Sequence, residues 1–341
     1  MNNIRLTTLG GVRENGKNMY VAEVGESIFV LDAGLKYPEN EQLGVDVVIP
    51  NMDYLFENKD RIAGVFLTHG HADAIGALPY LLAEAKVPVF GSELTIELAK
   101  LFVKGNDAVK KFNDFHVIDE DTEIDFGATI VSFFRTTHSI PESLGIVLKT
   151  SDGSIVYTGD FKFDQTASES YATDFGRLAE IGRDGVLALL SDSANADSNI
   201  QVASESEVGD EITQTIADWE GRIIVAAVAS NLSRIQQVFD AALNFLSRSG
   251  LNSTTSSLAP FVVEYLASKS KNSLSEVILI VGNTCPFNIN DVYSTPLTYF
   301  SIRTISSYLR PSLTAFSTSF LSLMKKVATL EPPELGFINT G

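Results

Sequence analysis

The chain has 341 residues, of which 45% are hydrophobic and 20% are charged, and this composition excludes wholesale disorder and allows a buried core. Its 43 acidic and 25 basic residues give a net charge of −18, which excludes a strongly basic surface overall as a means of holding nucleic acid. Cys285 is the single cysteine, so an internal disulfide and a zinc cluster of several thiolates are also excluded.

Short apolar runs alternate with helical patterns along the first 244 residues. In chain order, we predict strands at 19–24, 28–31, 64–67, 129–134, 155–157, 187–190 and 223–228. Helices are predicted at 77–85, 93–102 and 205–219, and the last of them opens with a capping box of Ser204 and Glu207. This alternation favours an α/β protein with layers around a sheet.

The composition changes near residue 244. Residues 1–244 carry a net charge of −20 and 16 serines, whereas residues 245–341 carry +2, and 17 serines fall in 245–324 alone. A buried strand at 277–281 is one interpretation of this less regular tail. We find neither an apolar leader nor an apolar run of the roughly 18 residues that a membrane span needs. The sequence therefore predicts a cytoplasmic protein without a membrane partner.

Three of the four histidines and two aspartates follow predicted strands. His69, His71 and Asp73 come after the strand at 64–67, His138 after that at 129–134, and Asp160 after the next predicted strand. Strand ends on one edge of a layered α/β fold are where sites assemble, and the two-residue spacing of His69 and His71 lets both imidazoles reach one metal. Three nitrogens and a carboxylate suit zinc with one position open for water. The fourth histidine, His116, has no such partners and is predicted to be structural.

The segment 69–76, which reads HGHADAIG, resembles the HxHxDH motif of the metallo-β-lactamase superfamily. The segment LDAG at 31–34, His138 and Asp160 resemble the other motifs of that superfamily. Longer stretches, at 9–20, 157–164, 189–195 and 229–237, are similar to the ribonuclease J family, in which a β-CASP insert interrupts the nuclease domain. The resemblance runs from about residue 4 to about residue 243.

The resemblance implies a four-layer αββα fold, which is an α/β architecture, for a nuclease domain over residues 1–195. It implies the beginning of a β-CASP α/β domain over 196–244, and it leaves 245–341 as a divergent or disrupted tail, of which we favour the disrupted form. Carried over by position, the metal ligands would be His69, His71, Asp73, His138 and Asp160. The catalytic residues would be Asp73 and Asp160, and substrate contacts would come from Asp192, Ser230 and Asn231. Zinc is the expected metal, with about one ion tightly held, and manganese and magnesium are the alternatives.

Ala74 stands where the HxHxDH motif has its last histidine, and no histidine follows His138. The first change is typical of the second, active-site-degenerate ribonuclease J paralogue of Firmicutes. The implied function is RNA phosphodiester hydrolysis, as a 5′→3′ exonuclease and endonuclease in mRNA decay and ribosomal RNA maturation, with weak or lost activity. RNA and an active paralogue are the implied partners, the latter in a hetero-oligomer.

Two other functions remain open. The chain could be a non-catalytic subunit that binds RNA or the paralogue, or another hydrolase of the metallo-β-lactamase fold that acts on a small ester or thioester. The negative net charge of the chain favours a small substrate, whereas the sequence motifs near Asp192 and Asn231, which resemble those of β-CASP proteins, favour RNA. Metal content and nuclease activity, measured with and without an active paralogue, would distinguish the ribonuclease from the non-catalytic subunit.

Overall fold

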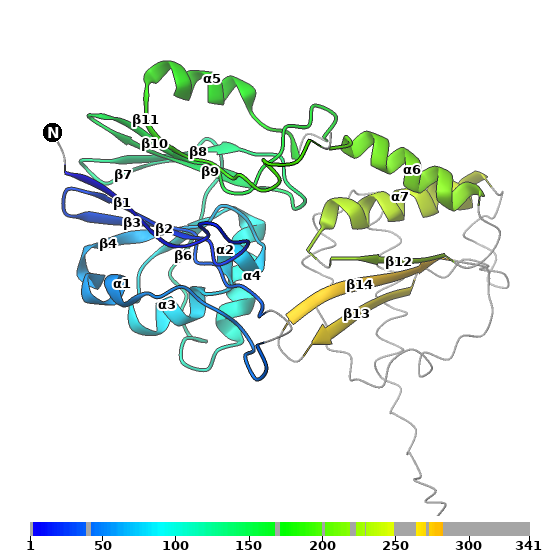
Figure 1. Cartoon of the computed structure of the whole chain (residues 1–341), viewed down its shortest axis with the longest axis horizontal. Helices are drawn as coiled ribbons and strands as arrows, with labels where there is room; N and C mark the ends of the chain where they lie inside the picture. Colours follow the sequence, from blue (N-terminus) through cyan, green and yellow to red (C-terminus); the bar gives the residue numbers. More distant parts are fainter. Residues whose placement is uncertain are drawn as a thin grey trace, which may run out of the picture.

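A computed structural model describes residues 3–38, 42–167, 171–199, 202–218, 223–228, 230–248, 264–270 and 273–281. The strands in these ranges form three sheets (Figure 1). Most of the tail predicted to be divergent or disrupted lies outside the described residues. No helix within the described ranges is both long enough and apolar enough to cross a membrane.

The first sheet supplies the segment that carries two of the predicted histidines. Its six strands, in spatial order, are β1 (Ile4–Gly10), β2 (Met19–Val24), β3 (Ser27–Leu31), β4 (Ile62–Phe66), β5 (Val89–Gly91) and β6 (Phe115–Val117). The first three strands pair antiparallel, and β3 to β6 pair parallel. The central strand β4 is apolar and almost wholly buried, as expected of a parallel strand that is covered on both faces.

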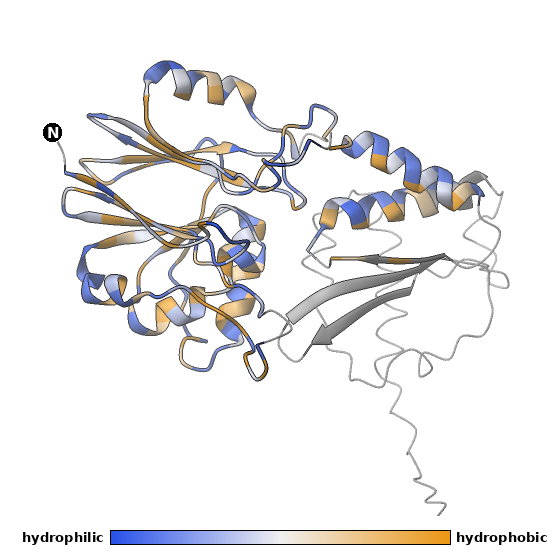
Figure 2. Cartoon of the chain, viewed as in Figure 1, coloured by the Kyte–Doolittle hydropathy of each residue, from blue (hydrophilic) through white to orange (hydrophobic). Residues whose placement is uncertain are grey.

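The second sheet packs face to face against the first. Its spatial order is β11 (Val186–Leu190), β10 (Gly153–Tyr157), β9 (Leu144–Thr150), β8 (Ile130–Arg135) and β7 (Glu123–Asp125). One buried cluster joins the two sheets and includes Phe29 and Phe66 from the first sheet and Phe133 and Ile146 from the second. Figure 2 shows long hydrophobic stretches along the strands of both sheets. This shared core holds the two sheets in a fixed relation, which positions the loops at their ends.

Helices cover the outer faces of this sandwich (Figure 1). On the first sheet lie α1 (Asp53–Glu57), the 3₁₀-helix at Lys59–Arg61, α2 (Ala72–Ile75), α3 (Leu78–Glu84) and α4 (Glu93–Lys104). Leu78, Leu81 and Ile96 of these helices share one buried cluster with Val30 and Val65 of the sheet. On the second sheet lies α5 (Phe175–Asp184), which buries Ile181 against the strands. The order helix, sheet, sheet, helix confirms the predicted four-layer αββα arrangement.

A further α/β unit follows the sandwich in the chain. It contains α6 (Glu205–Asp218), β12 (Ile223–Ala227), α7 (Leu232–Arg248), β13 (Glu264–Ser270) and β14 (Ser273–Val281). The predicted capping box opens α6, because the Ser204 backbone N–H donates to Glu207 Oε2 (2.8 Å) and the Glu207 backbone N–H donates to Ser204 Oγ (3.2 Å). β14 pairs with both β12 and β13, so this sheet combines residues from both sides of position 244.

All the strands and helices predicted in the first 244 residues are present, but others were missed, among them β1, β9, α5 and α7. The missed strand β9 lies between β8 and β10, so the strands that lead to His138 and Asp160 are not neighbours in the sheet. Gly145 interrupts the apolar pattern of β9 because the ring of Phe134 packs against its backbone and leaves no space for a side chain. A Cβ atom at this position would lie 2.1 Å from the Cζ atom of Phe134.

Candidate metal centre

The ends of three strands bring the five predicted metal ligands together at one edge of the sandwich. β4 runs directly into the segment with His69 and His71, and Asp73 lies in the short helix α2 that follows. His138 lies after the end of β8, and Asp160 lies three residues after the end of β10. The buried strands fix where each of these segments begins, so the convergence depends on the packing of both sheets.

The five side chains form two overlapping groups, His69-His71-His138 and His69-Asp73-Asp160, each with ligand atoms within 4.8 Å of one another. The three imidazole rings have their centroids 4.8 Å apart. His138 Nε2 lies 3.0 Å from His71 Nδ1, close to the ~3.3 Å between two nitrogens on a tetrahedral zinc ion with bonds of about 2.0–2.1 Å. Asp160 Oδ2 lies 3.9 Å from His69 Nε2 and 3.8 Å from His138 Nε2. Both separations allow one cation to lie between the groups.

His69 provides the strongest test of whether this site fits a metal. Its side chain is 1% exposed, and its Nε2 has no hydrogen-bond partner among the described residues. Its Nδ1 lies 2.9 Å from Thr68 Oγ1, and that hydroxyl lies 2.9 Å from Asp32 Oδ2. When Asp32 is ionised, its carboxylate only accepts, so the hydroxyl donates its one proton to Asp32 and accepts the Nδ1 proton of His69. Nε2 then holds a bare, buried lone pair directed at the other ligands, which is the tautomer that binds a metal.

The protonation of the imidazoles also suits metal binding. Burial lowers the pKa of His69 well below its ordinary value, and the neighbouring rings of His71 and His138 lower it further. Burial likewise lowers the pKa of His71, and it brings that of His138 to about 3 with a contribution from His71. All three rings are therefore neutral near pH 7, which is the form that donates a lone pair.

The carboxylates of the site concentrate negative charge. Burial, followed by the charges of Asp73, Asp192 and Asp32, raises the pKa of Asp160 to about 8. Burial also raises the pKa of Asp73, and Asp192 adds to that effect. Like charges held close together in a partly buried site favour the binding of a divalent cation, which compensates them. The donor set of three imidazoles and two carboxylates therefore fits a divalent metal ion.

Ala74 has no donor atom to offer a second metal position. It is fully buried in the apolar cluster beneath the helices of the first sheet, together with Leu35 and Leu78. The second group of ligands is therefore limited to His69, Asp73 and Asp160 among the described residues. This is a poorer donor set than the one offered by the three histidines.

The predicted substrate-contacting residues lie on two segments beside the metal centre. Asp192 follows β11, where its backbone N–H donates to Thr158 Oγ1 (3.1 Å) and its charge acts on Asp160. The carbonyl oxygen of Ser230 lies 3.4 Å from His71 Nε2. Asn231 caps α7, because its Oδ1 accepts the backbone N–H of Arg234 at 3.0 Å. Asp192 and the Ser230 carbonyl thus act on residues of the centre, whereas the hydrogen bond of the Asn231 side chain is to the first turn of α7.

Residues outside the predicted site hold the ligands in place. Asp32 is fully buried and accepts hydrogen bonds from the backbone N–H of Thr68 (2.8 Å) and from Tyr157 Oη (2.8 Å). It adopts φ = 59°, a left-handed conformation that aspartate tolerates better than most residues. Asn18 donates a long hydrogen bond of 3.5 Å from Nδ2 to Asp73 Oδ2. Two sequence signals pointed to position 32, namely its polar residue directly after an apolar strand and its place in the LDAG segment that resembles a superfamily motif.

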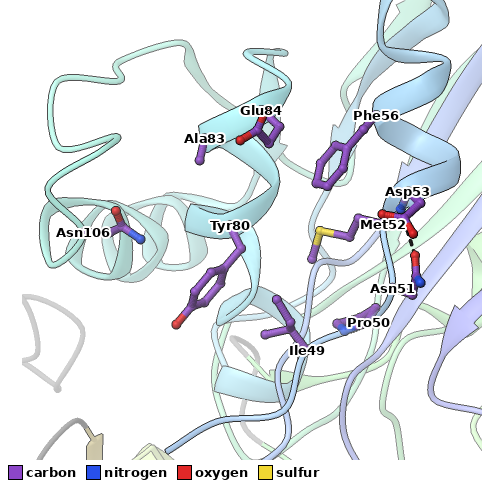
Figure 3. A pocket seen from close by; sticks show the side chains of 10 residues that line it. All are labelled: Ile49, Pro50, Asn51, Met52, Asp53, Phe56, Tyr80, Ala83, Glu84 and Asn106. Atoms are coloured by element: carbon purple, nitrogen blue, oxygen red, sulfur yellow. Dashed lines mark hydrogen bonds between the residues drawn. The ribbon is translucent and has the colours of Figure 1, made fainter.

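An open cavity of about 510 Å³ lies outside the metal centre (Figure 3). It is lined by the segment before α1 and by residues of α1 and α3, with Met52, Phe56 and Tyr80 as its large side chains. Its lining contains no histidine and none of the metal-centre residues.

His116 is also separate from the centre, because it pairs with Asp114 (2.9 Å) and stacks on Phe90, as a structural histidine would.

Comparison with known proteins identifies the fold family. The family profile described as metallo-β-lactamase superfamily matches residues 12–196, more than half of the chain. This chain belongs to the metallo-β-lactamase superfamily. Among its relatives in the superfamily, Ribonuclease J 2 of Streptococcus pyogenes serotype M3 is 72% identical over 242 residues, or 71% of this chain and 44% of the relative. Ribonuclease J2 of Bacillus subtilis is 52% identical over 240 residues, or 70% and 43%. The predicted resemblance to ribonuclease J is confirmed.

The match to these ribonuclease J proteins is partial in length. The chain spans less than half of each of the two relatives. A crystal structure of a protein of unknown function from Enterococcus faecalis is similar with a TM-score of 0.52 and 16% identity, over 74% of this chain and 69% of that one. At this level of identity the similarity concerns the fold alone.

Proposed function

We propose that this chain is a ribonuclease J-type, metal-dependent RNA phosphodiester hydrolase with weak or lost activity. The observation that carries the proposal is the metal centre itself, in which His69, His71 and His138 converge with two carboxylates while Ala74 offers no donor. The similarity to ribonuclease J 2 proteins supports RNA as the substrate class. In a cell, such an activity would belong to mRNA decay and ribosomal RNA maturation in the cytoplasm.

The residues of the centre divide the chemistry between them. A bound divalent metal supplies a Lewis acid for the phosphoryl group and acidifies a water molecule. His69, His71 and His138 would hold the metal through Nε2, Nδ1 and Nε2, because these are the atoms that face one another. Asp160 would also hold the metal, because its Oδ2 lies near both His69 Nε2 and His138 Nε2. Asp73 would orient the attacking water and accept its proton.

The missing donor at position 74 is the reason to expect slow catalysis. Phosphodiester hydrolysis with two metals stabilises both the attacking and the leaving oxygen, and a single well-built position stabilises them incompletely. Removing one such electrostatic contact typically costs about 10²–10³ in rate. We therefore expect hydrolysis at least about 10²-fold slower than that of a paralogue with an intact motif.

The test measures decay of 5′-monophosphorylated RNA by the purified chain with zinc or manganese, beside His71→Ala. Slow, metal-dependent decay that His71→Ala abolishes supports the proposal. Decay at the rate of an intact paralogue would show that the site is not impaired. Cleavage of a small thioester in preference to RNA would instead support another hydrolase of this fold.

A non-catalytic subunit is the second candidate, and the buried alanine at position 74 is the observation that favours it. Its partner would be RNA or an active ribonuclease J paralogue, in a hetero-oligomer. Size-exclusion chromatography of a mixture with the paralogue, and an RNA-binding assay without hydrolysis, test this role. Complex formation without any hydrolysis by the chain alone would favour this candidate over the first.

We also propose that the chain is divided into a nuclease domain over 1–195, the beginning of a β-CASP domain over 196–244 and a divergent or disrupted tail over 245–341. The separate packing of α6 and α7 beyond the two large sheets supports the first boundary (Figure 1). Limited proteolysis with mass spectrometry tests the second boundary. A protease-resistant fragment that ends near residue 240 is expected, and a fully resistant tail would contradict a disrupted one.

A further inference from the structure

The segment that leads into α7 touches the metal centre, although it lies 159 residues from His71 in the chain. The carbonyl oxygen of Ser230 lies 3.4 Å from His71 Nε2. Three residues later, the backbone N–H of Ser233 donates to the carbonyl oxygen of Ser139, at 3.2 Å, directly after His138. His71 is therefore in contact with the segment just before α7, and His138 is next to a residue that is hydrogen-bonded to α7.

The contact with Ser230 favours one tautomer of His71, and the tautomer decides which nitrogen can bind a metal. A carbonyl oxygen only accepts, so the hydrogen bond exists only when His71 carries its proton on Nε2. His71 Nδ1 then holds the lone pair, and this is the atom that lies 3.0 Å from His138 Nε2 inside the cluster. Outer partners of this kind fix the ring and the tautomer of metal-binding histidines, and their loss typically weakens metal affinity 10–100-fold.

Glu205, the first residue of α6, forms hydrogen bonds both to the beginning of α7 and to the loop that follows Asp160. Its Oε1 accepts a hydrogen bond from Lys162 Nζ (2.6 Å), a residue of that loop. Its Oε2 accepts hydrogen bonds from Ser233 Oγ (3.1 Å) and from Gln237 Nε2 (2.9 Å), both in α7. One carboxylate thus joins α7 to the segment that carries a metal ligand.

The surroundings of Glu205 keep this carboxylate ionised and in place. Burial raises its pKa, but Lys162, Arg234 and Ser233 outweigh burial, so that the pKa lies below its ordinary value. Its backbone N–H donates to Asp164 Oδ2 at 2.7 Å, which fixes the start of α6 against the same loop. The side chain is 21% exposed, so its hydrogen bonds are largely protected from water.

We propose that Glu205 is a positioning residue for the metal centre. It holds the first turn of α7 in place, so that the Ser230 carbonyl keeps His71 in the tautomer that presents Nδ1 to the metal. This inference rests on metal binding by the site described under the proposed function, but it does not require that the chain hydrolyse RNA. It makes metal affinity in the sandwich dependent on the docking of the second α/β unit.

The test compares zinc affinity, measured by competition with a chromophoric chelator, between the full chain and Glu205→Ala. We expect Glu205→Ala to bind zinc about 10-fold more weakly. The matched control is Glu211→Ala, which removes the same charge from an exposed position of the same helix and should leave the affinity unchanged. An equal affinity for the full chain and Glu205→Ala, or an equal loss in Glu211→Ala, would overturn the proposal.

A spectroscopic measurement separates positioning from general loosening of the structure. Nitrogen-15 NMR of the zinc-free protein should show His71 protonated on Nε2 in the full chain and as a mixture of tautomers in Glu205→Ala. A drop in affinity without this change of tautomer would contradict the route through Ser230. If Glu205→Ala loses its circular dichroism spectrum, Ser233→Ala decides, because it removes only the hydroxyl hydrogen bond to Glu205. It should weaken zinc binding in the same direction by a smaller factor, and no change would overturn the proposal.

The outcomes for the metal site and for this inference are distinct. A full chain that binds no zinc would contradict the metal centre, and with it both the proposed function and the role of Glu205. A full chain that binds zinc while Glu205→Ala binds it equally tightly would contradict only the role of Glu205. RNA hydrolysis enters neither comparison.

Discussion

Replacing Thr68 with valine tests how the buried residues behind the ligands prepare the metal centre. The substitution keeps the shape of the side chain and removes the hydroxyl that accepts from His69 Nδ1 and donates to Asp32. Two buried polar groups then each lose a partner, while the backbone N–H of Thr68 and Tyr157 Oη still donate to Asp32. At about 1–3 kcal/mol for each group left without its partner, the expected loss of stability is about 2–6 kcal/mol.

The loss should depend on pH through Asp32. Burial raises the pKa of this carboxyl from 3.8 to about 7, although hydrogen bonds from Thr68 and Tyr157 oppose the shift. Because the pKa of Asp32 is higher in the folded than in the unfolded chain, the folded chain loses stability as the pH rises from 3.8 to about 7. Above that pH Asp32 is ionised, and the hydrogen bonds that it accepts stabilise its charge. Removing a donor therefore costs more when Asp32 is ionised, and Thr68→Val should destabilise the zinc-free chain more at pH 8 than at pH 5.5.

Urea unfolding of the zinc-free chain at both pH values measures the stability, and chelator competition measures zinc affinity, which should fall about 10–100-fold. Thr95→Val is the matched control. Thr95 is also fully buried, and its hydroxyl accepts from Ser92 Oγ at 2.8 Å, but it lies in α4, which carries none of the predicted metal ligands. It should lose stability equally at both pH values and keep its zinc affinity. Equal behaviour of the two variants would refute the proposed link from Asp32 through Thr68 to His69.

Three further predictions concern the ligands themselves. Elemental analysis should find about one tightly held zinc or manganese in the full chain and none in His71→Ala, and two stoichiometric metals in the full chain would argue against a single well-built position. Asp160→Asn should raise the stability of the zinc-free chain by about 1–3 kcal/mol at pH 8 and by less at pH 4, because the raised pKa of Asp160 makes its ionised form unfavourable. Urea unfolding without zinc measures this, and equal stability at pH 8 would contradict it. Ala74→His should add bound metal while RNA decay stays slow, and it should cost about 1–3 kcal/mol because the site is fully packed. A variant that gains no metal would show that Asp73 and Asp160 do not form half of a second site.

The sequence by itself determined the layered α/β class and singled out the side chains that the structure brings together as candidate metal ligands. Continuous apolar runs such as the one that became β4 can only be buried, and polar residues directly after such runs must lie at a sheet edge. The histidine spacing at 69 and 71 and the carboxylate at 160 were therefore readable as a potential metal site. The alanine at position 74 was equally readable as a missing donor.

Only the tertiary structure decided what surrounds these ligands. Nothing in the spacing of Asp32, Thr68 and Tyr157 indicates that one carboxylate orients His69, because the three are brought together by the packing of two sheets. The contacts of Ser230 with His71 and of Glu205 with Lys162 join segments that are far apart in the chain. Local sequence patterns report which residues are buried and how they repeat, whereas the tautomer of a histidine depends on the atoms that the whole fold places beside its ring.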